Sequence, residues 1–222
     1  MNIKAFIFDM DGTLVDSLGF WAWFWSRLGK RYLGIDNYAP DPAVDSAVRT
    51  MTYSDGMLYI RSSLGITGDL DEYVAYTKNE LAYYYANVTP PKHGALQFLA
   101  YLKEKCTPMC LCSATDPEGI KHAILNTGIG EYLKDVILCA DVGLGKEHPD
   151  VYYLAEKRLG VPRENIAVVE DSPVALETAK AAGFFTVGVY DSHSYSLDRV
   201  RAASDIYIDR EHNLTDLIGK IC

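Results

Sequence analysis

The sequence has no long hydrophobic run, no excess of basic residues and no signal-peptide pattern. Its apolar stretches stop well short of the roughly 20 residues that a membrane-spanning helix needs, and the opening Met1-Asn2-Ile3-Lys4 does not resemble a leader. With 21 basic and 30 acidic residues, the formal net charge is −9, so no basic block is available to neutralise nucleic-acid phosphates. We therefore expect a cytoplasmic protein with neither a membrane nor nucleic acid as partner. A small anionic substrate is compatible with this charge, because a metal and a few cations can reverse the field inside one pocket.

Cysteine is too sparse and too irregularly spaced to form a disulfide framework or a zinc site. Cys110 and Cys112 would point to the same face of one strand, where neither a disulfide nor a tetrahedral site fits. We expect reduced residues buried in a core, with Cys222 in the tail. The chain's 5 cysteines are Cys106, Cys110, Cys112, Cys139 and Cys222.

The chain opens with an apolar run that leads into two acidic residues. Ala5 to Phe8 does not alternate with polar residues, which is typical of a strand buried on both faces. Asp9 and Asp11 follow at once, and Gly12 allows a sharp turn. Two neighbouring carboxylates repel each other unless a cation, a shared proton or open solvent relieves them, and Mg²⁺ is the simplest neutraliser. The alternative is a pair of solvated loop acids.

Residues 16–87 contain no convincing strand, only helical patterns rich in aromatic residues. The predicted helices cover 18–28 (capped by Asp16 or Ser17), about 40–52, 54–64 and 69–87. The first helix has one face predicted as core and a second that is either core or faces a cleft or a partner. The first face carries Leu18, Trp21, Trp25 and Leu28; the second carries Phe20, Trp23, Phe24 and Arg27.

From residue 94, apolar strands alternate with amphipathic helices. The predicted strands cover 108–112, 136–139, 166–169, 184–189 and 205–208; the predicted helices cover 95–105, a stretch from 116, 149–159, 174–182 and a C-terminal segment. Thr115 and Glu118 have capping-box spacing for the helix from 116. The pattern predicts an α/β fold with a doubly wound, mainly parallel, Rossmann-like sheet and an inserted all-α domain. We place the α/β domain at 1–15 and 88–222 and the helical domain at 16–87.

Polar residues gather where the predicted strands end. They are Asp9 and Asp11, Ser113, Lys146 in a loop after a strand, and Glu170 with Asp171. In a parallel sheet these ends converge at one edge, where ligands bind. Taken singly, Ser113 fits a helix cap, Lys146 a solvated charge and Glu170-Asp171 an acidic helix start.

This set resembles the motifs of the haloacid dehalogenase (HAD) superfamily over nearly the whole chain. The four motifs match Asp9-Met10-Asp11-Gly12-Thr13, Ser113, Gly145-Lys146-Glu147-His148-Pro149-Asp150 and Glu170-Asp171-Ser172, the last followed by Ala181-Ala182-Gly183. The helical insert is similar to the cap of the phosphoglycolate phosphatase and β-phosphoglucomutase subgroup. The resemblance implies a HAD-like core with a helical cap, and a Mg²⁺-dependent enzyme acting on a small phosphorylated metabolite.

The resemblance also implies roles for individual residues. Asp9 would be the nucleophile that forms an aspartyl-phosphate, and Asp11 would be the general acid and base. Mg²⁺ would be held by the Asp9 carboxylate, the Asp11 carbonyl and Asp171, with Glu170 acting through water or from further out. The phosphoryl oxygens would contact Lys146, Ser113 and backbone groups near Ala114 and Gly12.

Two positions depart from the subgroup's pattern. Ala175 stands where glycine is usual, a change that a helix tolerates. The specificity loop near Arg49-Thr50-Met51-Thr52 lacks its usual glycine, so the substrate does not follow from the insert. Arg49, Trp23 and Phe20 are candidate substrate contacts, and for Arg49 a solvated helix charge is the alternative.

Three functions fit the residues to different degrees. The first is a phosphatase for small phosphate monoesters, because family members that act on phosphate esters need an acid at the position of Asp11, whereas those that act on carbon–halogen bonds or phosphonates lack one. The second is a sugar phosphomutase of the β-phosphoglucomutase type, which would use the same core but keep water from the intermediate. The third is a non-catalytic binding protein on the same scaffold.

Overall fold

The computed structural model describes residues 2–221 except 49, 50, 52 and 195. The chain forms two compact units. One, here called the core unit, comprises residues 1–18 and 85–222, and the other, the helical unit, comprises 19–84. These boundaries lie within a few residues of the domain limits drawn from the sequence. The function of the helical unit as a cap stays a prediction.

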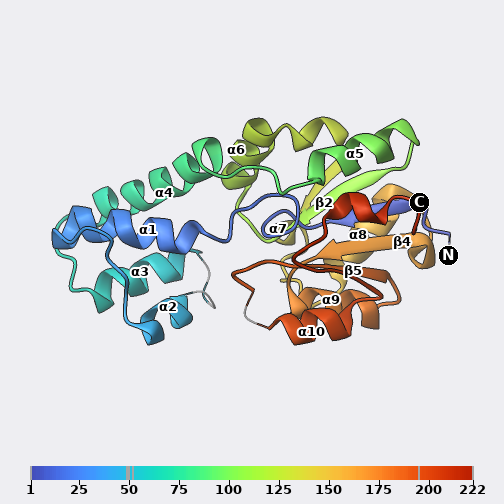
Figure 1. Cartoon of the computed structure of the whole chain (residues 1–222). Coiled ribbons are helices and arrows are strands. Elements are labelled where there is room, and N and C mark those ends of the chain that lie inside the picture. The colour runs from blue at the N-terminus through green and yellow to red at the C-terminus, as the bar shows by residue number, and fades with distance from the viewer. Residues whose placement is uncertain (1, 49–50, 52, 195, 222) are drawn as a thin grey trace. The chain divides into compact units, whose positions relative to one another are not determined.

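The core unit is built on a six-stranded sheet in which every neighbouring pair of strands is parallel. The strand order is β3-β2-β1-β4-β5-β6, so the first strand of the chain lies in the middle of the sheet (Figure 1). The strands are β1 (Ala5–Phe8), β2 (Met109–Ser113), β3 (Asp135–Leu138), β4 (Ile166–Glu170), β5 (Phe185–Val189) and β6 (Ile206–Ile208). The predicted α/β fold with a parallel Rossmann-like sheet is confirmed.

Helices cover both faces of the sheet, which explains the unbroken apolar run of β1. Ile7 faces a cluster that includes Val151 and Tyr152 of α8 (Asp150–Leu159) and Ala179 of α9 (Pro173–Ala181). On the other face, the ring of Phe98 in α5 (Ala95–Glu104) lies edge-on to Phe6, with ring centroids 5.5 Å apart. Figure 1 shows α5 above the sheet and α9 below it. All four residues of β1 are therefore buried.

The remaining helices of the core unit include two that were not predicted. α6 (Pro117–Thr127) agrees with the prediction, whereas the short α7 (Cys139–Val142) takes up the end of the strand predicted to 139, and α10 (Leu197–Ala203) was missed. The predicted C-terminal helix is wrong: the segment forms one 3-10 turn, η4 (Leu214–Leu217), and Gly219 then adopts a φ of +80°. Further 3-10 turns are η2 (Ile129–Tyr132) and η3 (Arg163–Asn165).

The helical unit has its own apolar core. Its helices are α1 (Phe20–Leu28), the π-helical η1 (Gly29–Leu33), α2 (Pro42–Val48), α3 (Tyr53–Ser63) and α4 (Leu70–Asn87), whose last three residues belong to the core unit. Both predicted faces of α1 supply buried residues: Trp25 and Leu28 from one, Phe20 and Phe24 from the other. Leu18 lies outside the helix. The second face is thus at least partly core.

Two further expectations concern the burial of the cysteines and the lack of a membrane-spanning segment. Cys110, Cys112 and Cys139 are buried free thiols, as predicted, but the prediction is wrong for Cys106, which is exposed in a turn with a φ of +54°. Cys222 lies outside the described residues. Among the residues that the structure describes, no helix has the length and apolar character to cross a membrane.

Candidate active site

Three neighbouring strands end at one edge of the sheet and bring the predicted residues together. Phe8 of β1 is in register with Leu111 of β2 and with Val169 of β4. The residues that close or follow these strands are Asp9, Ser113, Glu170 and Asp171. Asp9 is still tied to the sheet, because its N–H donates to the carbonyl of Val169 at 2.9 Å.

Lys146 lies among these carboxylates although it comes from a loop between α7 and α8. Its ammonium donates to Asp9 Oδ1 and, at 2.5 Å, to Glu170 Oε1. The side chain is only 11% exposed, so the alternative of a solvated loop charge is wrong. Burial lowers the pKa of Lys146, but the carboxylates of Asp9 and Glu170 outweigh this and hold the pKa well above its ordinary value. Lys146 is therefore a fixed cation in the site.

The acids outnumber this cation. Carboxylate oxygens of Asp9, Glu170 and Asp171 lie within 4.8 Å of one another, and all three residues are buried. With every group ionised, three carboxylates and one ammonium leave a net charge of −2. Burial and repulsion from Glu170 raise the pKa of Asp9 to about 8, although Lys146 opposes the shift. Burial, Glu170 and Asp9 likewise raise the pKa of Asp171 well above its usual range. The alternative of solvated loop acids is wrong for Asp9.

This donor set fits a hard divalent cation. Carboxylate oxygens are the ligands that Mg²⁺ prefers, and a charge of +2 would balance the cluster. The oxygens of Glu170 are already engaged, because Oε1 accepts from Lys146 while Oε2 accepts from the N–H groups of Asp171 and Ser172, each at 2.9 Å. Glu170 thus braces the turn between β4 and α9, but α9 has no acidic residue in its first turn, so the alternative of an acidic helix start is wrong. Asp9 and Asp171 are the better direct ligands.

Gly12 and Thr13 fix the turn beside Asp171. Gly12 has a φ of +77°, and a Cβ there would lie 2.6 Å from Asp171 Oδ2. Thr13 is fully buried, and its hydroxyl donates to Asp171 Oδ1 at 3.2 Å. No role was predicted for Thr13, although it stands in the first motif. Thr13 thus holds the Asp171 carboxylate, and Gly12 leaves the space that this carboxylate occupies.

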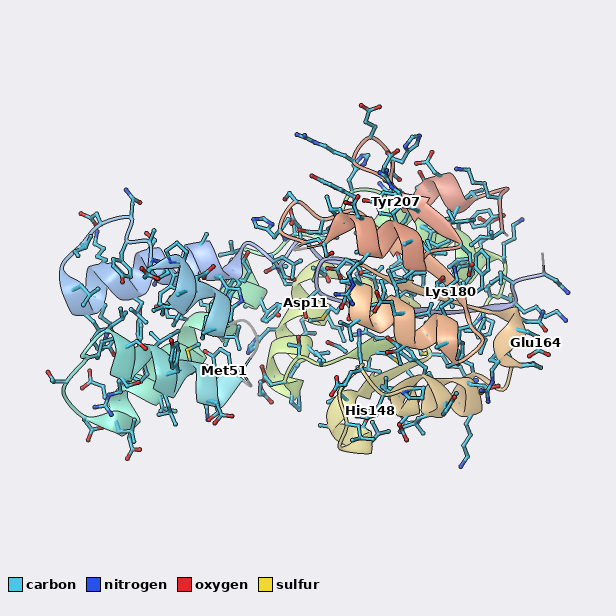
Figure 2. The ribbon with its side chains drawn as sticks, turned by 90° about the horizontal axis from the view of Figure 1, so that it is seen from below. Asp11, Met51, His148, Glu164, Lys180 and Tyr207 are labelled. Atoms are coloured by element: carbon cyan, nitrogen blue, oxygen red, sulfur yellow. The ribbon has the colours of Figure 1, made fainter. Side chains whose placement is uncertain are left out.

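Asp11 lies apart from the acid cluster in its contacts, among hydroxyl groups. Its Oδ1 accepts from Ser17 at 2.5 Å and from Tyr85 at 2.7 Å, and its Oδ2 accepts from Thr115 at 2.5 Å. All of these residues belong to the core unit. Figure 2 shows Asp11 at one end of that unit and Glu164 at the other.

The predicted capping box of α6 is wrong. The N-cap is Asp116, whose carboxylate accepts from the N–H groups of Glu118 and Gly119, so Thr115 is left to bond Asp11. Tyr85, Thr115 and Ser17 were not predicted as site residues. The sequence indicated Ser17 and Thr115 only in that both carry hydroxyl groups and follow the first two motif strands. Nothing in the sequence indicated Tyr85.

Ser113 and Ala114 occupy the end of β2. Ser113 is buried, and its hydroxyl oxygen accepts from the Thr115 N–H at 3.1 Å, so it is not the cap of α6. Ala114, by contrast, is exposed at this edge. Their contacts with phosphate, like those of Gly12 and Lys146, stay predictions.

Two of the three candidate substrate contacts lie in the helical unit, and the third lies outside the residues that the structure describes. The Phe20 side chain is only 7% exposed and packs against Phe24 and Tyr84. Trp23 is half-buried, stacks on Tyr83 and lies under the Arg27 guanidinium. Arg49 lies outside the described residues, as do Thr50 and Thr52 of the predicted specificity loop. A role in substrate binding stays a prediction for all three candidates.

Known proteins resemble this chain over most of its length. A family model for haloacid dehalogenase-like hydrolases matches residues 3–183. Validoxylamine A 7'-phosphate phosphatase of Streptomyces hygroscopicus subsp. limoneus is 30% identical over 86% of this chain and 87% of its own. Phosphoglycolate phosphatase of Rhodospirillum rubrum is 31% identical over 97% and 91%, respectively.

A solved structure shares the whole fold. It is that of a Thermotoga maritima protein provisionally described as a β-phosphoglucomutase, which superposes with a TM-score of 0.84 at 21% identity, covering 99% of this chain and 100% of the other. At this identity the likeness concerns the fold alone.

Proposed function

Since this chain belongs to the haloacid dehalogenase-like hydrolase family, we propose that it is a Mg²⁺-dependent phosphatase for a small organic phosphate monoester. The observation that carries the proposal is the buried group of Asp9, Lys146 and Asp171 at the end of β1. A carboxylate held beside a fixed cation and a second carboxylate suits attack on a phosphoryl group, whose own negative charge would otherwise repel the nucleophile. Relatives named as phosphatases support the reaction class.

The residues present fit the metal that the family implies. Asp9 and Asp171 would hold it through carboxylate oxygens, the Asp11 carbonyl would add a third ligand, and Glu170 would act indirectly because its own oxygens bond Lys146 and backbone N–H groups. When bound, Mg²⁺ supplies positive charge to the phosphoryl oxygens and neutralises the acid cluster.

In the first step, an oxygen of the Asp9 carboxylate forms a bond to phosphorus, and the bond from phosphorus to the ester oxygen breaks. Asp11, protonated, gives its proton to that departing oxygen. The product alcohol leaves, and an aspartyl-phosphate remains on Asp9. Lys146 compensates charge on the transferring group, since its ammonium already contacts Asp9.

In the second step, a water molecule attacks the phosphorus of the aspartyl-phosphate. Asp11, now ionised, takes a proton from this water, and the bond from phosphorus to Asp9 breaks. Inorganic phosphate and the original carboxylate result. Ser113, with backbone groups near Ala114 and Gly12, would hold the phosphoryl oxygens in both steps, and the helical unit would act as the cap that selects the substrate.

The test measures phosphate release from 4-nitrophenyl phosphate and 2-phosphoglycolate with Mg²⁺ present. Asp9→Asn should lower kcat at least about 1,000-fold, because an amide is no nucleophile. Glu164→Gln, a charge-neutralising change at the opposite end of the core unit, should leave kcat unchanged (Figure 2). Full turnover by Asp9→Asn would overturn the proposal. So would product isomers that require a bisphosphate activator in place of free phosphate, which would identify a phosphomutase.

A further inference from the structure

The carboxylate of Asp11 is fixed by hydroxyl groups from three separate segments of the core unit. Ser17 follows the first motif, Tyr85 is the first residue of the returning segment, and Thr115 follows β2. A carboxylate has about four lone-pair positions, two on each oxygen. Ser17 and Tyr85 use both positions of Oδ1, whereas Thr115 uses one of the two positions of Oδ2. One position, on Oδ2, remains for a reacting proton.

Tyr85 is held firmly enough to define this geometry. Its side chain is 7% exposed, and the side-chain amide of Asn126 donates to its carbonyl at 3.0 Å and to that of Thr89 at 2.9 Å. The ring also depends on Gly119 of α6, where a Cβ would lie 3.2 Å from Tyr85 Cε2. Burial, with the nearby charge of Asp11, raises the pKa of Tyr85 well above its usual value, so the phenol stays a donor. α6 therefore fixes the backbone of Tyr85 through Asn126, and its Gly119 leaves room for the ring.

Thr115 is placed by the same helix. Asp116 provides the N-cap of α6, and the Thr115 N–H donates to Ser113 Oγ at 3.1 Å. This backbone bond sets the residue between the end of β2 and the start of α6, where its hydroxyl meets Asp11 Oδ2. A Cβ on Gly119 would also lie 3.0 Å from Thr115 Cγ2, so this glycine leaves room for both residues.

We propose that Tyr85 and Thr115 are positioning residues that hold the Asp11 carboxylate with Oδ2 as the oxygen that exchanges the proton. The inference rests on the proposed phosphatase function. A single hydrogen bond would leave the carboxylate able to rotate, whereas donors on both oxygens fix its plane. Tyr85 and Thr115 act through Asp11 and need not touch the substrate.

The leaving group distinguishes positioning from a merely structural role. A poor leaving group such as the alkoxide of 2-phosphoglycolate needs the proton of Asp11, but 4-nitrophenolate departs without one. Tyr85→Phe and Thr115→Val each remove one hydroxyl and keep the shape of the side chain. Each should lower kcat for 2-phosphoglycolate about 10- to 100-fold, within the range of general acid–base effects, with KM changed less than about 3-fold.

The pre-steady-state release of 4-nitrophenol reports the first chemical step alone. Its rate should change less than about 3-fold in both variants, since that step then needs no acid. Thr115→Ser keeps the hydroxyl and should retain most of the activity. Tyr73→Phe is the matched control: it removes another buried phenol, bonded to the Met57 carbonyl at 2.8 Å in the helical unit, and should change neither rate.

Equal losses for the two esters, or no loss for 2-phosphoglycolate, would overturn the inference while leaving the phosphatase function intact. The function itself is judged on the wild-type chain and on Asp9→Asn. If the wild-type chain released phosphate from neither ester, the function would fall and the inference with it.

Discussion

The substitution Asp9→Asn should make the metal-free protein more stable although it removes the proposed nucleophile. Asp9 is 7% exposed and shares its surroundings with Glu170 and Asp171. Ionising it in the folded chain is unfavourable, as its pKa of about 8 shows. An amide has the same shape without the charge, so the folded state should gain.

The pKa sets both the sign and the upper limit of this gain. The ordinary pKa of Asp9, which applies to the unfolded chain, is 3.8 and the folded value is about 8. The folded state therefore binds a proton that the unfolded chain releases. The stability that this group contributes is fully present below pH 3.8 and is lost as the pH rises through 8, at about 1.4 kcal/mol per pH unit. At pH 7 the accumulated loss is at most about 4 kcal/mol.

The substitution by asparagine should recover only part of this lost stability. An amide makes different hydrogen bonds from those of a protonated acid, including the contact with Lys146, so we expect a net gain of about 1–3 kcal/mol at pH 7, growing from pH 5 to pH 8. Mg²⁺ should narrow the difference, because it stabilises the folded wild-type chain by binding while the variant has lost a ligand.

Urea denaturation in EDTA at pH 5, 6, 7 and 8 measures the gain. All 3 tryptophans, Trp21, Trp23 and Trp25, lie in the helical unit, so their fluorescence does not report on the sheet. The unfolding of the sheet is instead followed by hydrogen exchange of the peptides that contain β1 and β4. Glu164→Gln, an exposed acid at the opposite end of the core unit, is the control and should show no such gain (Figure 2). A variant less stable than wild type at pH 8, or a difference independent of pH, would refute the reasoning.

Three further changes test the same site. Gly12→Ala should cost at least about 1–2 kcal/mol because of the φ of +77°, and should weaken Mg²⁺ binding in calorimetry by displacing Asp171; unchanged Mg²⁺ affinity would contradict this. Asp116→Ala should cost about 1 kcal/mol in urea denaturation by removing the N-cap of α6, and a neutral result would exclude that cap. Lys146→Met should cost about 3–5 kcal/mol at pH 8 and less at pH 5, where Asp9 is protonated in the folded state; a loss independent of pH would exclude the charge argument.

Local patterns were enough to predict the sheet and the residues at its edge. The unbroken apolar run of β1 indicated a strand buried on both faces, and the strand ends of a parallel sheet had to meet at one edge. Asp9 and Asp171 followed from that rule together with the motifs. Their burial and the contact of Lys146 with Asp9 did not follow from local patterns, because solvated loop positions were equally compatible with the sequence.

The surroundings of Asp11 could not be predicted in the same way. Tyr85 and Thr115 reach it across 74 and 104 positions of the chain, and neither distance leaves a periodic signal. The spacing of Thr115 and Glu118 even favoured a capping box, yet Asp116, one residue later, competed successfully for the cap. Local spacing cannot decide between such neighbours, because the outcome depends on what a distant segment offers each side chain.

The different partners of Asp9 and Asp11 follow from the tight turn that the chain makes directly after β1. In a continuing strand, two residues that lie two positions apart would point to the same side. Here the strand stops, and the N–H groups of Leu14 and Val15 donate to the Met10 carbonyl at 2.9 and 3.0 Å. Gly12 supplies the positive φ that this turn requires. Asp9 therefore meets Lys146, while Asp11 meets hydroxyl groups. Under the proposed function, Asp9 as nucleophile needs a neighbouring cation, and Asp11 as general acid needs partners that fix it without competing for its proton; one tight turn would serve both needs.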